Sequence, residues 1–264
     1  MKTPVFPLMP GRRRRFTFSA SIRRPPSTLN TSSETCEHQT GGEISDDAVK
    51  TIRKIFISDY DGTITERDFY SLLAERYVPP GTPDYFALYR EGRMTHFEAM
   101  AAYFAFVPSE EQLIEELFDA SHADPDLGSS AAILQRAGWE LVVVSAGSSW
   151  YVERVLGRTG LAVPVYSNPG HLENGRGLVL ERLDASSPYH STSMGVDKAA
   201  VVRHCLQVAD TVAFAGDGPP DLQPALLVRP QFRFARGFLA DALHDRGDEF
   251  RRFSRWSEIA RELA

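Results

Sequence analysis

The sequence has few cysteines and no long hydrophobic run. Its 264 residues include two cysteines, Cys36 and Cys205, too few for a disulfide framework, which favours a reducing compartment. The longest purely aliphatic runs, such as Leu141 to Val144, have the length of a strand, whereas a bilayer-spanning helix needs about 20 apolar residues. These absences speak against a disulfide-rich secreted protein and against a membrane partner.

Basic residues are scarce outside the N-terminal segment. Seven of the 29 lysines and arginines lie in residues 1–33, which contain no acid, so the remaining 22 face 35 acidic residues, a formal charge of −13. Because nucleic-acid affinity depends on cationic contacts to phosphates, we expect no nucleic-acid partner. Any phosphate group must be bound by a local site rather than by a broad basic surface.

Residues 1–47 are rich in Pro, Ser, Thr and Arg and have no sustained hydrophobic period, which predicts a disordered basic extension. The same composition is typical of organellar transit peptides. An upstream start that is not part of the functional protein would give a similar segment. We expect a cytoplasmic protein, or an organellar one if this segment is a transit peptide. A secretory signal fits badly because no apolar segment follows the arginines.

Beyond the extension, short hydrophobic strands alternate with helical segments. The predicted strands are Ile52–Ser58, Glu140–Val144, Val163–Ser167, Thr211–Ala215 and Phe232–Ala235, with Leu178–Leu183 returning from a turn at Asn174–Gly177. This alternation predicts an α/β fold with a doubly wound parallel sheet covered on both faces. Ligands of such sheets lie at the carboxyl ends of the strands.

A helical insert separates the first two strands. We assign residues 48–66 and 138–264 to a core and residues 67–137 to a small helical cap. The predicted helices begin at Phe69 and lie around Tyr85–Glu91, Thr95–Phe106 and Ser109–Ser121. Their predicted N-caps are Thr82, Thr95 and Ser109, with Glu98 and Gln112 completing two capping boxes.

Two carboxylates follow the first strand, in Asp59-Tyr60-Asp61-Gly62-Thr63. If the chain turns at Gly62, one can attack phosphorus while the other protonates the leaving oxygen and then activates water. A divalent cation would relieve their repulsion, and Mg²⁺ prefers such hard oxygen ligands. Alone, the motif is equally typical of an ordinary turn after a strand.

Three further clusters end strands or begin helices. Ser145 follows the second strand, where its hydroxyl and nearby amides predict an anion cradle. Lys198 lies in the first turn of a helix, where the dipole disfavours a cation, so we predict that it neutralises phosphate and the nucleophile. Asp217 and Asp221 follow Thr211–Ala215 and are predicted to hold a metal. The order and spacing of the four clusters favour one site over four ordinary turns.

Together these clusters resemble the four motifs of the haloacid dehalogenase superfamily, with a helical insert in the C1 cap position, over about residues 50–240. The resemblance implies a Rossmann-like core, Mg²⁺ as cofactor, Asp59 as nucleophile and Asp61 as acid and base, whose backbone carbonyl also binds the metal. It assigns phosphate to Ser145, Ala146, Lys198 and Gly62, and the metal to Asp59, Asp61, Asp217 and Asp221.

Within the superfamily, Ser58–Thr65, Ser145–Gly147 and Ser187–His190 are similar to the phosphoserine-phosphatase-like branch and to MtnX-like phosphatases, named for a methionine-salvage enolphosphate phosphatase. Asp68 occupies the place of a cap-side Glu that meets the substrate amine in phosphoserine phosphatases. We expect Asp68 to cap the helix from Phe69, with substrate contact as the alternative. Four other insert side chains could face the substrate but are more typical of surface or packing positions: Arg67, Tyr70, Arg93 and His96.

The predicted function is therefore hydrolysis of a small phosphorylated metabolite through an aspartyl-phosphate intermediate, by a monomer or a homodimer. One alternative is a phosphotransferase, in which an alcohol replaces water. The other is a non-catalytic phospholigand-binding regulator, against which the intact motif residues count. No pattern in the sequence identifies the substrate.

Overall fold

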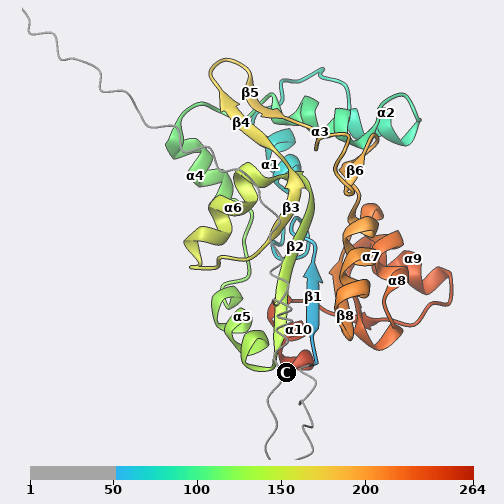
Figure 1. Cartoon of the computed structure of the whole chain (residues 1–264). Helices are drawn as coiled ribbons and strands as arrows, with labels where there is room; N and C mark the ends of the chain where they lie inside the picture. Colours follow the sequence, from blue (N-terminus) through green and yellow to red (C-terminus); the bar gives the residue numbers. More distant parts are fainter. Residues whose placement is uncertain (1–51) are drawn as a thin grey trace, which may run out of the picture. The chain divides into compact units, whose positions relative to one another are not determined.

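The computed structural model describes residues 52–264; residues 1–47, with their predicted disorder or targeting role, lie outside the described part. The described residues contain a six-stranded parallel sheet with the order β10-β9-β8-β1-β2-β3 (Figure 1). Its strands are β1 (Lys54–Ser58), β2 (Trp139–Ser148), β3 (Val165–Asn168), β8 (Thr211–Gly216), β9 (Arg233–Ala235) and β10 (Arg251–Arg252). No helix in the described range combines the length and hydrophobicity needed to cross a bilayer.

Helices cover both faces of this sheet, because successive strand residues point to opposite sides. Phe56 belongs to one core cluster, with α5 (Leu127–Arg136), α6 (Ser149–Arg158) and α10 (Trp256–Leu263). Ile55 and Ile57 belong to the other, with α7 (Lys198–Val208), α8 (Leu222–Leu227) and α9 (Gly237–Asp245), on the opposite side in Figure 1. The predicted doubly wound α/β fold is confirmed.

The order of the strands fixes where a ligand can bind. From β1 the chain goes to β2 and β3 on one side, then crosses to β8, β9 and β10 on the other. The order therefore reverses between β1 and β8, where Ser58 lies opposite Ala215. Such a switch point opens a crevice at the carboxyl ends of the two strands.

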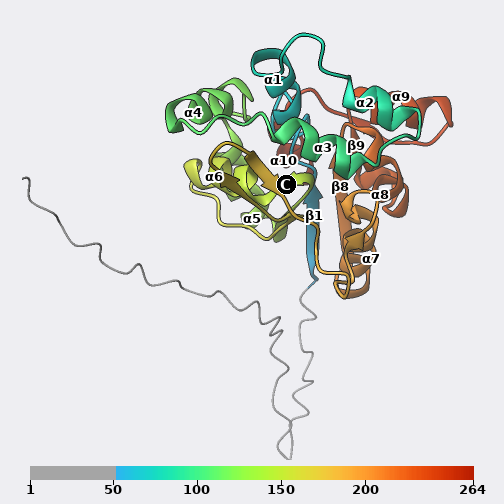
Figure 2. The same cartoon turned by 90° about the horizontal axis from the view of Figure 1, so that it is seen from above.

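The segment between β1 and β2 contributes α1 (Phe69–Arg76), α2 (Tyr85–Arg90), α3 (His96–Phe104) and α4 (Glu111–Ala120). The first three lie beyond the carboxyl ends of the central strands (Figures 1 and 2). A hairpin of β4 (Gly170–Glu173) and β5 (Gly177–Leu180) packs against α3, and α5 packs against α10 and β2. The division into a core and a cap of residues 67–137 stays a prediction.

Smaller elements complete the chain. They are the paired strands β6 (His190–Ser191) and β7 (Gly195–Val196) and the short 3-10 helices η1 (Pro219–Asp221) and η2 (Pro230–Phe232). The backbone N–H of Phe97, in α3, donates to the Ser193 carbonyl in the β6–β7 turn at 2.9 Å. The insert is thus tied to a loop that directly precedes α7.

Some predicted helix caps are wrong. Thr95 does cap α3, and its box with Glu98 is complete. The cap of α2 is Asp84 rather than Thr82, consistent with the stronger capping preference of Asp, and its carboxylate accepts from the Ala87 N–H at 2.9 Å. Helix α4 begins after Glu110, which makes no side-chain cap bond.

Ser109 and Gln112, the predicted capping box of α4, point elsewhere. The Ser109 hydroxyl lies 3.4 Å from Asn174 Oδ1, and Gln112 Nε2 donates to Glu116 Oε1 at 3.2 Å. Gln112 bonds within α4 and Ser109 bonds to the turn between β4 and β5, so neither side chain caps the helix.

The contrast between the two serine/threonine positions gives a matched test of stability. Thr95→Ala removes a cap and is expected to lower the free energy of unfolding by about 1 kcal/mol. Ser109→Ala removes no cap and is expected to change it by less than about 0.5 kcal/mol. Urea denaturation of both variants measures the difference, and equal losses would contradict the assignment of the caps.

Candidate active site

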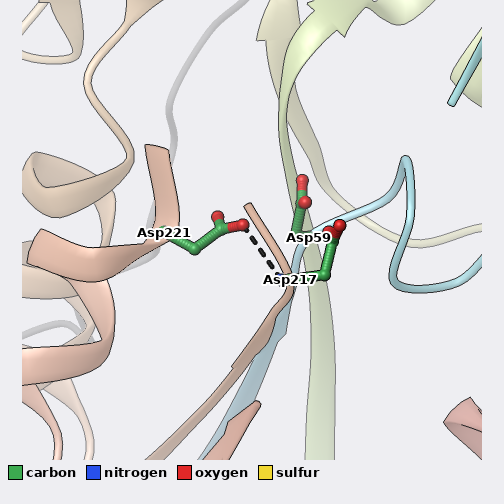
Figure 3. Close-up of side chains that lie close together, drawn as sticks. All are labelled: Asp59, Asp217 and Asp221. Carbon is green, nitrogen blue, oxygen red and sulfur yellow. Dashed lines mark hydrogen bonds between the residues drawn. The ribbon is translucent and has the colours of Figure 1, made fainter. Parts of the chain in front are cut away.

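Three carboxylates from two segments far apart in the sequence meet at the switch point. Asp59 directly follows β1, and its N–H donates to the Ala215 carbonyl of β8 at 2.9 Å. Asp217 follows β8, and Asp221 ends η1. One oxygen of each carboxylate lies within 4.8 Å of the others (Figure 3). The carboxylates predicted to share a site are therefore close together.

Lys198 lies between two of these carboxylates. Its Nζ donates to Asp59 Oδ1 at 2.6 Å and to Asp221 Oδ1 at 2.7 Å, and the side chain is 5% exposed. Burial acts to lower the pKa of Lys198, but attraction by Asp221 and Asp59 outweighs it and raises the pKa. The unfavourable helix position of this lysine is thus offset by two buried ion pairs.

Asp221 organises the turn after β8. Its Oδ2 accepts from the backbone N–H groups of Asp217 at 3.2 Å and Gly218 at 3.0 Å, the first of which is the dashed line in Figure 3. Its other oxygen accepts from Lys198. Asp221 therefore fixes the Asp217 backbone and the Lys198 ammonium together, while its predicted contact with a metal stays a prediction.

The loop after Asp59 turns sharply at Gly62. Gly62 has a φ of 69°, and a Cβ there would overlap the Asp217 carboxylate. The Thr63 hydroxyl donates to Asp217 Oδ1 at 3.0 Å. Arg236, just after β9, donates to the carbonyls of Gly62 at 2.5 Å and Thr65 at 2.6 Å. Gly62 thus lets β1 and β8 bring their carboxylates together.

Asp61 has a separate set of partners. Tyr151, on α6, donates its hydroxyl to Asp61 Oδ2 at 2.5 Å, and the Phe69 N–H donates to Oδ1 at 3.0 Å. Burial raises the pKa of Asp61 to about 6, although these two hydrogen bonds oppose the change. A carboxyl with this pKa can hold or release a proton near neutral pH, as a general acid and base requires.

The expected capping role of Asp68 is wrong. Asp68 occupies the N-cap position of α1 but makes no side-chain cap bond, and the Phe69 N–H donates to the Asp61 carboxylate. The Asp68 side chain lines the cavity described below, and burial, with repulsion by Asp61, raises its pKa to about 6. The alternative, contact with a substrate, stays a prediction.

Ser145 lies within β2 rather than at its end. The strand continues to Ser148, four residues beyond the prediction, because pairing with β3 resumes at Ser148 and Asn168 after an irregularity. Ser148 caps α6, and the Ser145 hydroxyl accepts from the Gly147 N–H at 3.0 Å. Ser145 and Ala146 both line the cavity, and their phosphate-binding role stays a prediction.

The charge of the clustered carboxylates is only partly compensated, which favours the binding of a cation. Burial and the charge of Asp221 raise the pKa of Asp59, against the opposing effect of Lys198, and the same two causes raise the pKa of Asp217 to about 7. One ammonium serves three clustered carboxylates. The all-oxygen donor set fits Mg²⁺, which would favour the charged forms of these acids.

A cavity of about 340 Å³ connects these groups to the insert. Its opposite side is formed by five insert side chains, here called the insert wall: Tyr70, Phe86, Tyr89, His96 and Met100. Tyr70 and His96, expected at surface or packing positions, therefore line the cavity. Arg67 and Arg93 instead form ion pairs on the surface, with Glu75 and Glu91 respectively.

Several residues of the site carried no recognisable sequence signal. Tyr151 lies in the first turn of the helix after Ser145–Gly147, at no motif spacing. Arg236 could be predicted in part, because it directly follows the predicted strand Phe232–Ala235 at the same sheet edge. The aromatic residues of the insert wall look like ordinary core positions until the fold brings them over the carboxylates.

His96 predicts a pH dependence of stability. Burial, with repulsion by Lys198, lowers the pKa of His96 to about 4, below the ordinary 6.5, so the unfolded chain binds this proton more readily. Stability is lost as the pH falls from 6.5 toward 4, by about 2 kcal/mol between pH 7.5 and pH 5 for this group. His96→Phe should remove this part of the acid sensitivity in urea titrations, whereas His171→Phe, at an exposed position, should retain it.

Comparisons with known proteins agree with this geometry. A family model described as haloacid dehalogenase-like hydrolase matches residues 56–225. The chain is 23% identical to a 2-hydroxy-3-keto-5-methylthiopentenyl-1-phosphate phosphatase of Brevibacillus brevis, over 79% of this chain and 94% of the relative. It is 21% identical to a protein of the same name from Bacillus cereus, over 78% and 93%.

Solved structures share the fold. A phospho-aspartyl intermediate analogue of phosphoserine phosphatase superposes with a TM-score of 0.57 at 14% identity, over 81% of this chain and all of that one. A phosphoserine phosphatase from T. onnurineus gives a TM-score of 0.54 at 13% identity, over 84% and 98%. At such low identity the likeness concerns the fold alone.

Proposed function

Because the chain belongs to the haloacid dehalogenase-like hydrolase family, we propose that it is a phosphatase in which Asp59 is the covalent nucleophile. The observation that carries the proposal is the pairing of Asp59 with Lys198 in a cavity that also holds Asp61. The ammonium holds Asp59 Oδ1, and Asp61 has a pKa of about 6. One buried acid is thus positioned for attack and the other for proton transfer.

In the first step an Asp59 oxygen attacks phosphorus, and the bond from phosphorus to the substrate oxygen breaks. Asp61 gives its proton to that oxygen, so the product leaves as a neutral alcohol. Tyr151 and the Phe69 N–H hold the Asp61 carboxyl in place. Lys198 compensates negative charge on the transferring phosphoryl group.

In the second step Asp61, now a carboxylate, takes a proton from a water molecule as that water attacks the aspartyl phosphate. The bond between phosphorus and Asp59 breaks, and inorganic phosphate and both carboxyl groups are restored. The same residue serves as acid and then as base, which a pKa near 6 favours at neutral pH.

Asp59, Asp217 and Asp221, with the backbone carbonyl of Asp61, would hold Mg²⁺. When bound, Mg²⁺ supplies a fixed positive charge that polarises a phosphoryl oxygen and reduces repulsion between the dianion and the carboxylates. The clustered carboxylate oxygens and their raised pKa values support this assignment.

The proposed substrate is a small phosphorylated metabolite, by analogy with the phosphatases named above. The cavity of about 340 Å³ has room for such a molecule. The proposed enzyme works in the cytoplasm as a monomer or a homodimer. The acidic body supports the absence of a nucleic-acid partner.

Phosphate release from p-nitrophenyl phosphate and a panel of phosphorylated metabolites tests this function. We expect turnover with Mg²⁺, a loss of at least about 100-fold after treatment with EDTA, and recovery when Mg²⁺ is restored, because the metal's charge supports phosphoryl transfer. Full activity in EDTA would contradict the metal assignment. Transfer of phosphate to an added alcohol in place of water would identify a phosphotransferase.

A further inference from the structure

Asn168, the last residue of β3, is a fully buried amide that joins two segments of the site. Its Nδ2 donates to the Ala146 carbonyl at 2.9 Å and to the Met194 carbonyl at 3.1 Å. Ala146 adjoins Ser145 in β2, and Met194 lies in the β6–β7 turn, four residues before Lys198. One side chain therefore holds the two segments that lead to the predicted phosphate-binding side chains.

The orientation of this amide follows from its partners. Both are carbonyl oxygens, which only accept hydrogen bonds, so the group that faces them is the NH₂ of Asn168. Among the described residues Oδ1 finds no hydrogen-bond partner, and it lies against Gly195, where a Cβ would overlap it. A buried unpaired oxygen is unfavourable and calls for an explanation. The explanation we infer is that the site uses both N–H groups of this amide.

The bond to Ala146 fixes the direction of a neighbouring N–H. The Ala146 carbonyl and the Gly147 N–H belong to one planar trans peptide unit, in which the two groups point in opposite directions. With the carbonyl held toward β3, the Gly147 N–H donates to the Ser145 hydroxyl oxygen at 3.0 Å. Ser145 lines the cavity, whereas Asn168 is not among the cavity-lining residues. Asn168 thus reaches the cavity through one peptide unit and one hydroxyl.

The bond to Met194 holds the turn that precedes Lys198. One residue earlier in this turn, the Ser193 carbonyl accepts from the Phe97 N–H of α3 at 2.9 Å. The turn is therefore fixed by the insert on one side and by Asn168 on the other. Because the bonds of Asn168 are buried, water does not readily replace them when the amide is removed.

We propose that Asn168 is a positioning residue for phosphate binding, whose amide orients the Ser145 hydroxyl and keeps it in place relative to Lys198. This inference rests on the proposed phosphatase function and adds a residue to its site. Asn168 contacts no substrate, so its effect passes chiefly through Ser145. Since substrate and product both carry the phosphate group, the binding of both depends on Asn168.

Loss of the amide should weaken phosphate binding. The full chain with Asn168→Ala is assayed with Mg²⁺ on p-nitrophenyl phosphate, with inorganic phosphate as inhibitor. We expect kcat/KM to fall by at least about tenfold and the inhibition constant of phosphate to rise by a similar factor, because a displaced hydroxyl binds the phosphoryl group poorly. Asn174→Ala, in the exposed β4–β5 turn, should stay within about threefold of the wild type. Unchanged phosphate affinity in Asn168→Ala overturns the proposal.

A double-mutant cycle separates positioning of Ser145 from a general loss of stability. Asn168→Ala is introduced into Ser145→Ala, where no hydroxyl remains to be oriented. We expect its effect on kcat/KM to shrink to within about threefold in that background, because residues that act through one another are not additive. An effect of the same size in both backgrounds would show that Asn168 does not act through Ser145.

A second pair of variants decides the question if Asn168→Ala does not fold. Gly195→Ala places a methyl group against Asn168 Oδ1 at a φ of 81°. Gly175→Ala brings similar backbone strain, at a φ of 76°, with no described atom within 4 Å of the added methyl group. We expect a loss of at least about tenfold in kcat/KM for Gly195→Ala and less than about threefold for Gly175→Ala. Equal effects overturn the role of Asn168.

The wild type separates the two levels of the proposal. If it does not hydrolyse p-nitrophenyl phosphate with Mg²⁺, the proposed phosphatase function fails, and the role of Asn168 fails with it. If the wild type is active but the Asn168 and Gly195 variants match their controls, only the role of Asn168 fails.

Discussion

Replacing Asp59 by Asn is expected to lower kcat by about 10⁴-fold or more, because the amide oxygen is a far weaker nucleophile than a carboxylate. The variant should stay folded, since Asn has the same shape and can still accept a hydrogen bond from Lys198 Nζ. Steady-state assays with p-nitrophenyl phosphate measure the loss. Urea denaturation shows whether the protein remains folded.

A buried acid elsewhere in the chain provides the control. Asp124 accepts from the Ser257 N–H at 2.8 Å and the Asp126 N–H at 2.9 Å, and it is not among the cavity-lining residues. Asp124→Asn should weaken the fold yet leave kcat within about threefold, as expected for a residue outside the reacting groups. Comparable losses in both variants would show that the Asp59 effect reports stability rather than chemistry.

Replacing Asp61 by Asn is expected to lower kcat by about 10² to 10⁴-fold, the range typical of a general acid and base. The two steps should respond differently to the leaving group. p-Nitrophenolate departs without a proton, so formation of the aspartyl phosphate should stay fast, while its hydrolysis loses the base. Stopped-flow measurement should therefore show a burst of nitrophenolate of about one equivalent per active site, as for acyl-enzyme accumulation.

Asp68→Asn is the matched control for this second prediction. It removes a carboxylate from the same cavity without altering the hydrogen bond from Tyr151 to Asp61. We expect no burst with this variant, and a kcat within about tenfold of the wild type, because Asp68 has no part in proton transfer. A burst with Asp68→Asn, and none with Asp61→Asn, would exchange the assigned roles.

The sheet and the edge at which the carboxylates gather could be predicted because they follow from local patterns. The strands that end at Ser58 and Gly216 are short, apolar and buried, and parallel strands place their carboxyl ends at one edge. The proximity of Asp59 to Asp217 is a consequence of that topology. The sequence was therefore enough to predict that Asp59 and Asp217 lie close together, although they are far apart along the chain.

The rest of the site depends on packing between distant segments. Tyr151 reaches Asp61 only because α6 begins beside the loop that follows β1, and His96 lines the cavity only because α3 lies over the sheet edge. Asp68 was misjudged for a related reason, since its side chain lines the cavity and makes no bond to the first turn of α1. Local capping preferences do not include such tertiary surroundings.

The covalent bond to Asp59 is the central claim, and trapping it tests the claim most directly. Asp61→Asn is mixed with p-nitrophenyl phosphate and Mg²⁺, quenched in acid during the burst and treated with borohydride, which reduces an aspartyl phosphate to homoserine. Peptide mass spectrometry should then find homoserine at position 59. An unmodified Asp59 in a sample that gave the burst, or homoserine at another acid, would contradict the mechanism.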